Sequence, residues 1–263
     1  MSELRDLAGV GDTKSLSGLG RHILELNKAA KSFGVHLEYL TDFNHFREVV
    51  EAIPGRSGIT RIFDSHHCDI GPDNGYWIKG TDEEGQVVHV QAYRFDDLRD
   101  GTLAEHWQAN PEGFSPPGLE IDLEKSNFHT APVSHEISGT VCYHGDFWID
   151  SEFRNMRIGP ILTTFGMLLA ASRFTPDYIY CFVVPRMVRR GWPTRAGYLH
   201  LHPWAPSWYI SGQKRTYDDY LVWVTSQELI ELWTSRERDT DILGLTGEDD
   251  DSRSSVMQRV ARH

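Results

Sequence analysis

Apolar and polar positions alternate along several stretches of the chain in the two-residue rhythm of β-strands. Two such runs flank an Asp-Glu-Glu-Gly turn at residues 82–85 and predict a hairpin over residues 76–95. The β-branched and aromatic run DYIYCFVV predicts a central strand. Further strands are predicted in VHLEYL, in EISGTVCYHGDFWID with a bend near Gly145, in YLHLHPW, and in YDDYLVWV.

Between the predicted strands, apolar residues recur at the spacing of helices. One apolar stripe runs through residues 19–30. A second helix is predicted to begin at a Thr41 or Asp42 cap. A third begins at Ile158, where Pro160 is tolerated because it lies in the first turn. The final strand is expected to pass directly into a last helix.

The order of these elements predicts a mixed α/β sheet in a single domain and not a doubly wound nucleotide-binding fold. Residues 1–18 are expected to be a flexible leader and residues 19–235 the domain. Residues 236–263 are polar and acidic, so we expect a disordered tail. Residues 96–134 are too long for a plain connection and are predicted to be an insertion or a lid.

Charge and composition narrow the possible partners. The 263 residues carry a formal net charge of −12, which argues against a general nucleic-acid binder. The N-terminal segment lacks the features of a secretory signal, and no apolar run reaches the ~18 residues of a membrane span. The three cysteines are far apart and lack a CxxC spacing. They therefore favour reduced thiols and a cytoplasmic protein.

The stretch FWIDSEFRNMRIGPIL, residues 147–162, combines a strand, a polar turn and the start of a helix. The strand ends at Asp150, the turn carries Arg154 and Arg157, and the helix opens near Gly159. The first N–H groups of a helix have no partner within the helix, and the helix dipole adds partial positive charge. This arrangement is typical of a phosphate-binding site.

This stretch resembles the acyl-CoA-binding motif of the GNAT superfamily of N-acyltransferases. The order of the predicted elements from residue 35 to residue 225 is similar as well, with a hairpin, a bent strand, its helix and a further strand. The resemblance implies a single GNAT-like domain with a central, mostly antiparallel mixed sheet, a splayed bent strand and flanking helices. The matching positions are Phe147 and Ile149 in the strand, Arg154 as the first arginine, Ile158 and Gly159 as the terminal pair, and Leu162 as the next apolar site.

The resemblance also implies a reaction and its donor. We expect acetyl-CoA or another acyl-CoA as co-substrate and an amine of a small molecule as acceptor. By analogy, the backbone N–H of Ile149 would hold the thioester carbonyl. The residues implied in donor binding are Trp148, Ile149, Asp150, Arg154, Asn155, Met156, Arg157, Ile158 and Gly159.

Two positions depart from the family pattern. Asn155 and Arg157 stand where the family usually has glycine, and Arg157 replaces the glycine that brings the backbone close to the pyrophosphate. Such an altered cradle would suit a phosphopantetheine arm on an acyl carrier protein, as in the N-acyl amino acid synthases that this arrangement resembles. A basic cluster suits an acidic carrier or the CoA ribose phosphate, or is simply a solvated loop. It comprises Arg186, Arg189, Arg190 and Arg195.

Acyl transfer from a thioester to an amine requires a base, a donor to the carbonyl oxygen and an acid for the thiolate. Candidate bases are His144, Asp146 and Glu136 near the bent strand, and His200 on a later strand. The family's usual acid is a tyrosine on the helix after the fifth strand. That segment, RMVRRGWPTRAG, has none, and Tyr198 beyond it is the nearest substitute.

Two other classes of function stay open at this point. The missing glycines and tyrosine favour a GNAT-like module that has lost transfer and acts in binding or regulation. Alternatively, His200 and His202, two residues apart on one strand face, suit a metal-dependent enzyme. No third ligand can be identified from the sequence, so we expect no metal site.

Overall fold

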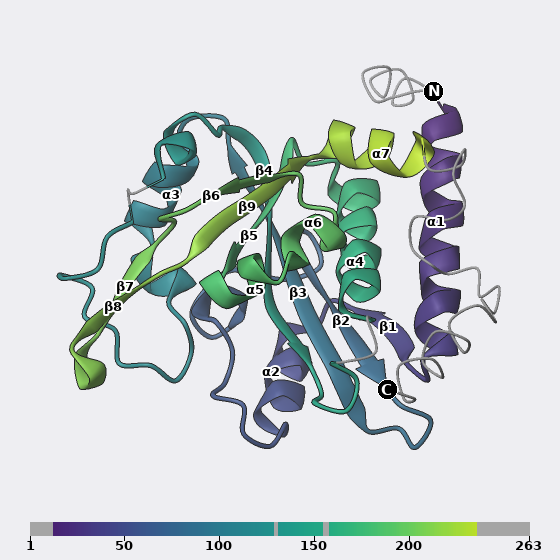
Figure 1. The fold of residues 1–263 in the computed structure, drawn as a ribbon, viewed down its shortest axis with the longest axis horizontal. Helices are drawn as coiled ribbons and strands as arrows, with labels where there is room; N and C mark the ends of the chain where they lie inside the picture. Colours follow the sequence, from purple (N-terminus) through teal and green to yellow (C-terminus); the bar gives the residue numbers. More distant parts are fainter. Residues whose placement is uncertain (1–12, 129–130, 155–157, 236–263) are drawn as a thin grey trace, which may run out of the picture.

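The computed structural model describes residues 13–128, 131–154 and 158–235. Seven strands form one sheet in the order β1-β2-β3-β4-β5-β9-β6, and β7 and β8 pair as a separate hairpin (Figure 1). Among the strand pairs of the described residues, only β4 and β5 are parallel. The mixed, mostly antiparallel sheet expected from the sequence is thus confirmed. The strands are β1 His36–Leu40, β2 Gly75–Thr81, β3 Val87–Leu98, β4 Gly139–Ile149, β5 Tyr178–Val183, β6 His200–His202, β7 Ser207–Ile210, β8 Arg215–Asp218 and β9 Tyr220–Thr225.

Helices cover both faces of this sheet. The long helices α1 and α4 lie side by side on one face, and α2 packs on the other (Figure 1). Within the described ranges, no helix has the length and apolar character to cross a membrane. The α-helices are α1 Thr13–Ser32, α2 Phe43–Glu51, α3 Leu103–Ala109, α4 Ile158–Phe174, α5 Pro185–Arg189, α6 Trp192–Ala196 and α7 Ser226–Ser235; the 3-10 helices are η1 Arg61–Phe63, η2 Pro111–Phe114, η3 Pro132–His135 and η4 Ser211–Gln213.

Two helix boundaries bear on the predictions. Asp42, one of the two caps predicted for α2, is the residue found at the cap position. Its side chain accepts hydrogen bonds from the backbone N–H groups of Asn44 and His45. Helix α1 begins at Thr13, so the structure places residues 13–18 of the predicted leader in a helix. Residues 1–12 of the leader, and the predicted tail at residues 236–263, lie outside the described residues.

Strand alternation divides the core into two layers. On β2, Tyr76 and Ile78 pack beneath α1 and α4, whereas Trp77 between them packs beneath α2. On β4, Cys142 belongs to the first layer and Tyr143 to the second. Successive side chains of a strand point to opposite faces, so a strand buried on both sides supplies residues to both layers.

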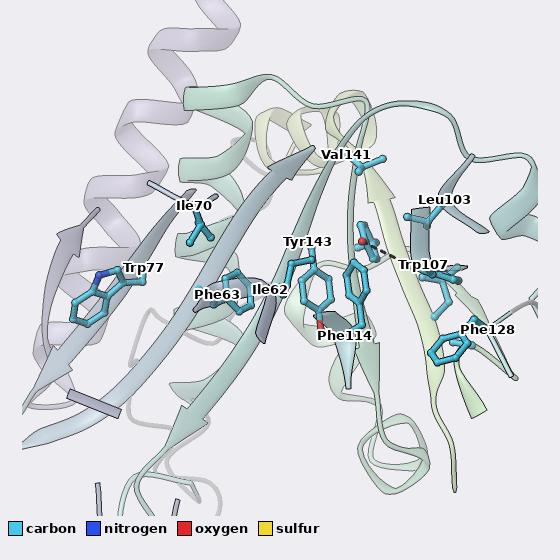
Figure 2. Packing of buried hydrophobic residues seen from close by; sticks show 14 of the residues in the cluster. Ile62, Phe63, Ile70, Trp77, Leu103, Trp107, Phe114, Phe128, Val141 and Tyr143 are labelled. Carbon is cyan, nitrogen blue, oxygen red and sulfur yellow. Dashed lines mark hydrogen bonds between the residues drawn. The ribbon is translucent and has the colours of Figure 1, made fainter. Parts of the chain in front are cut away.

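The predicted insertion is a packed part of the domain. Strand β3 continues to Leu98, so the connection begins slightly later than predicted and runs to the start of β4. It contains α3, which starts with a capping box between Thr102 and Glu105. Its side chains Trp107 and Phe114 are buried in the second layer, where the Phe114 ring lies 5.2 Å from that of Tyr143 (Figure 2). The insertion therefore closes the face of the sheet opposite α4.

The strands β4 and β5 diverge soon after they begin. They pair only where Val141 to Tyr143 lie beside Tyr178 to Tyr180. Farther along β4 the ladder with β3 is also interrupted, because two residues, Asp146 and Phe147, oppose the single residue Gln91. Asp146 has a φ of 49°, which marks the bulge. The bent, splayed strand implied by the resemblance is thus present.

Candidate active site at the diverging strands

The edge of β4 that faces away from β3 presents a backbone donor at Ile149. The N–H of Asp150 donates to the carbonyl of Val88 on β3 at 2.8 Å. The Ile149 carbonyl instead accepts from Nε of Arg154 at 2.8 Å. Because peptide groups alternate in direction along an antiparallel pair, the Ile149 N–H points to the outer edge, from which β5 has diverged. This is the N–H that the resemblance implies for the thioester carbonyl.

Tyr198 connects the two diverging strands. Its hydroxyl lies 2.8 Å from Nδ1 of His144 on β4 and is in contact with the thiol of Cys181 on β5. The segment reaches this position by turning at Gly197, whose φ of 100° favours glycine. The His144 ring stacks on Tyr93, with 4.6 Å between centroids. The structure therefore brings together the predicted base His144 and the predicted substitute acid Tyr198.

Burial fixes the protonation of this pair. It lowers the pKa of His144 to about 3, so the imidazole is neutral at pH 7. It raises the pKa of Tyr198 well above its usual value, so the phenol keeps its proton. The Nε2 atom of His144 is buried and has no hydrogen-bond partner among the described residues. A protonated phenol and a neutral imidazole suit proton transfer.

Asp146 lies on the opposite side of β4. Its carboxylate accepts hydrogen bonds from Oγ1 of Thr60 at 2.7 Å and from the Thr60 backbone N–H at 3.0 Å. Arg56 approaches the same carboxylate at 3.4 Å. Burial raises the pKa of Asp146 and lowers that of Arg56. These contacts hold the segment before η1 against the bulge.

Neither Thr60 nor Arg56 could be identified from the sequence, since Thr60 lies 86 residues from Asp146. Gly145 shows how closely this segment packs. A Cβ atom at Gly145 would lie 2.6 Å from the ring of Phe63 in η1. Any other residue at this position would push η1 away from β4.

The turn after β4 is described only at its two ends. Asp150 accepts a hydrogen bond from the backbone N–H of Glu152 at 2.9 Å, which starts the turn. Arg154 is exposed, and its Nε bond to Ile149 leaves the rest of its guanidinium available at the surface. The implied residues Asn155, Met156 and Arg157 lie outside the described residues.

Helix α4 begins at Ile158, which is buried, and passes Gly159 in its first turn. A Cβ atom at Gly159 would lie 3.6 Å from Nε1 of Trp192 in α6. The first turn of α4, the end of β4 and α6 therefore meet at one place. Trp148 points to the other side of the sheet, where it packs against the layer beneath α2.

Two predicted candidates do not join this site. Glu136 is exposed and precedes β4, whose first residue, Gly139, is itself about 23 Å along the strand from the bulge at 3.3 Å per residue. His200 lies on β6, three strand positions and about 14 Å from β4. Its Nε2 is 2.7 Å from Oε1 of Glu228, and its ring stacks on Trp223. His202 interacts with the carbonyl of Pro203, and the described part of the chain contains no cluster of three potential metal ligands.

Two side chains at the opening were not predicted as site residues. Phe147 on β4 packs in the layer beneath α4, with its ring 5.7 Å from that of Trp192 and 5.2 Å from that of His89. The sequence does carry a signal for His89. In the apolar strand VVHVQAYRF, His89, Gln91 and Tyr93 stand at every second position and so share one buried face.

No family model and no curated protein sequence matches the chain. Solved structures with a similar fold include a chimera of spermidine N-acetyltransferase SpeG from Vibrio cholerae and hSSAT, at 8% identity over 75% of this chain and 99% of that chain, with a TM-score of 0.46. NAA60 of Arabidopsis thaliana in complex with acetyl-CoA is 11% identical over 73% of this chain and 98% of that chain, with a TM-score of 0.44. Because these TM-scores lie below 0.5, we take nothing about substrates or residue roles from these similarities.

Proposed function

We propose that this chain is a GNAT-type N-acyltransferase that moves an acyl group from acetyl-CoA or another acyl-CoA to an amine of a small molecule. One observation carries this proposal. The Tyr198 hydroxyl lies 2.8 Å from Nδ1 of His144 where β4 and β5 diverge, on the strand whose outer edge presents the Ile149 N–H. An acid, a neutral imidazole and a backbone donor thus lie together at the opening where β4 and β5 separate.

The donor would lie along the α4 side of this opening. The Ile149 N–H is directed to donate a hydrogen bond to the thioester oxygen as negative charge develops on it. The exposed guanidinium of Arg154 and the first turn of α4, a helix of 17 residues, favour the phosphates. Arg154 is also held in place by its bond to Ile149, so it need not be ordered by the donor.

The chemistry requires two proton transfers. The amine nitrogen attacks the thioester carbon, the C–N bond forms, and the C–S bond breaks. Tyr198 gives its proton to the departing thiolate, and His144 holds the hydroxyl in place through Nδ1. Asp146, on the opposite side of β4 and with its pKa raised by burial, accepts the amine proton directly or through water. His144 is the alternative base.

A tyrosine variant tests this assignment. Tyr198→Phe removes the acid and keeps the ring, so kcat should fall by roughly 100-fold, the low end for acid–base catalysis because a thiolate leaves readily. The donor KM should change little. The measurement is thiol release from acetyl-CoA and longer acyl-CoA donors with a panel of amines. Tyr217→Phe, on the separate β7–β8 hairpin, is the matched control.

Two results would contradict the proposal. An unchanged kcat in Tyr198→Phe would remove Tyr198 from the chemistry. A wild-type protein that binds no CoA species in native mass spectrometry, and transfers no acyl group to any amine from acyl-CoA or from an acylated carrier protein, would end the acyltransferase proposal and favour a binding or regulatory module.

The surface of α5 and α6 supports a carrier protein as a second possible donor. Four exposed arginines lie there in a chain of net charge −12, and no acidic side chain of the described residues pairs with them. These are Arg186, Arg189, Arg190 and Arg195. Their helices adjoin the first turn of α4 through Trp192 and Gly159.

Charge reversal separates the two donors. The double substitution Arg189→Glu and Arg190→Glu should slow transfer from an acylated carrier protein by roughly tenfold or more, because electrostatic steering is lost. Transfer from acyl-dephospho-CoA, which lacks the ribose phosphate, should be unaffected. Equal rates of the wild type and the double variant with the carrier would leave acyl-CoA as the donor.

A further inference from the structure

His89 on β3 has a defined tautomer. Its Nδ1 lies 2.7 Å from the carbonyl oxygen of Trp148. A carbonyl oxygen can only accept, so Nδ1 carries the proton. Burial lowers the pKa of His89 to about 3, which keeps the ring neutral. Nε2 is therefore a bare lone pair that can only accept a hydrogen bond.

That acceptor has no partner in the part of the chain that the structure describes, although His89 is fully buried. The polar neighbours of His89 on β3 are paired. Gln91 donates to the carbonyl of Leu162 in α4 at 2.7 Å, and Tyr93 donates to that of Thr163 at 3.2 Å. A buried polar atom without a partner costs about 1–3 kcal/mol of stability. Such a cost calls for a functional explanation.

The ring of Phe147 packs against both unpaired imidazoles. It meets His89 at 5.2 Å and His144 at 5.6 Å, in both cases edge to face. His89 and His144 are 0% and 2% exposed, whereas Phe147 is only half-buried. A turn of the Phe147 side chain would therefore bring both imidazole edges to the opening.

His89 lies close to the place proposed for the acyl donor. His89 stands opposite Ile149 in the β3–β4 register, so it lies beside the residue assigned to the thioester carbonyl. The phosphopantetheine arm that follows a thioester contains two amide N–H groups. The same arm occurs in CoA and on carrier proteins, so either donor offers the same hydrogen-bond donors.

We propose that Phe147 is a gate, and that His89 Nε2 accepts a hydrogen bond from an amide N–H of the donor's phosphopantetheine arm when the gate opens. This inference rests on the proposed acyl transfer. It makes His89 a binding residue that distinguishes an amide-bearing arm from a simple thioester. The buried acceptor is then satisfied only in the donor complex.

An asparagine substitution tests the inference. In His89→Asn the amide nitrogen takes the place of Nδ1 and keeps the bond to Trp148, but the acceptor at Nε2 is lost. The Kd of CoA, measured by calorimetry, should rise roughly 3- to 10-fold, the equivalent of one neutral hydrogen bond. The kcat at saturating donor should be unchanged, and so should transfer from a short acyl thioester that lacks the amide arm.

His106→Asn is the matched control. His106 also has a buried Nε2 without a hydrogen bond, but it lies on α3 on the opposite face of the sheet, 3.7 Å from Asp96. Its substitution should leave the Kd of CoA within twofold of the wild type. If His89→Asn fails to fold, nitrogen NMR of the wild type decides, because the His89 Nε2 signal should shift when CoA is added.

The possible results are distinct. CoA binding by the wild type, with an unchanged Kd in His89→Asn or an unmoved Nε2 signal, overturns this inference and leaves the proposed function standing. A wild type that binds no CoA and transfers no acyl group from acyl-CoA or from an acylated carrier protein overturns both.

Discussion

The two faces of the sheet at the diverging strands differ in what they bury. Beneath the insertion, aromatic rings pack around Tyr143, with Phe114 at 5.2 Å and Phe63 at 5.7 Å (Figure 2). Beneath α4, the same strands bury His89 and His144, each with an Nε2 atom that no described residue satisfies. The α4 face therefore holds two unpaired imidazole nitrogens next to the same ring, that of Phe147, whereas the unpaired Nε2 of His106 on the opposite face lies 3.7 Å from the Asp96 carboxylate.

The comparison teaches where substitutions should affect folding and where they should affect donor binding. Both faces follow from one alternation of side chains along β3, β4 and β5. They are separable in experiment because the aromatic cluster around Tyr143 has no residue of the proposed proton transfers. Tyr198 and His144 lie on the α4 face, and Asp146 lies at the bulge of β4, outside that cluster.

The largest effect is expected on the aromatic face. Trp107→Ala removes a fully buried indole that packs 5.0 Å from Phe182 and donates to the Tyr180 hydroxyl at 3.4 Å. The free energy of unfolding should fall by about 3–5 kcal/mol. Urea unfolding measures this, with the exposed Leu24→Ala as control, expected within ~0.5 kcal/mol of the wild type. The Kd of CoA for the folded fraction should not change, and a selective loss of CoA binding would contradict the division between the faces.

A smaller effect is expected at the turn beyond the α4 face. Arg154→Ala should weaken donor binding by about 1–3 kcal/mol, because a charged hydrogen bond to phosphate would be lost. Stability should change little, since the side chain is exposed. Calorimetry with CoA measures the effect, and Arg99→Ala, which removes an equal charge from an exposed pair with Asp97, is the control. Equal affinities of the two variants would exclude Arg154 from the phosphate site.

The smallest effect concerns acid pH. Burial lowers the pKa of His89 and His144 to about 3, so below pH 6.5 the unfolded chain binds protons that the folded chain does not. Stability that is present at pH 7.5 is thus lost as the pH falls, by about 1.4 kcal/mol for each histidine at pH 5.5. Asp219, whose pKa burial raises to about 6, acts in the opposite direction between pH 3.8 and 6.

Urea unfolding of the wild type and of His89→Asn at pH 7.5 and 5.5 separates the contribution of His89 to the pH dependence of stability from that of Asp219. Asp219 is present in both proteins, so its contribution cancels in the comparison. On acidification, the free energy of unfolding of the variant should fall by about 1.4 kcal/mol less than that of the wild type. Equal losses of free energy of unfolding in the two proteins would mean that folding does not lower the pKa of His89.

Much of the fold could be predicted because its signals are local. The hairpin, the bent strand, α4 and β5 all follow from alternation or helical spacing within short windows. Helix α1 starts earlier than predicted, at Thr13, because a polar first turn carries no apolar stripe. The packing of the insertion could not be predicted, since Trp107 reaches Tyr180 across 73 residues of sequence.

The site could be predicted in part. The bent strand and the turn to α4 placed Ile149 and Arg154 near the proposed donor, because those residues are close in sequence. The choice among four candidate bases was beyond the sequence. Only the structure pairs His144 with Tyr198, 54 residues away, and leaves Glu136 and His200 elsewhere.

The sequence by itself determined which side chains share a face and where a helix opens after a polar turn, since backbone geometry sets both over a few residues. The tertiary structure alone decided where β5 leaves β4, which hydroxyl meets His144, and how deeply each ionisable group is buried. Strand pairing and burial depend on contacts between distant segments, and the pKa of a histidine depends on the burial that those contacts produce.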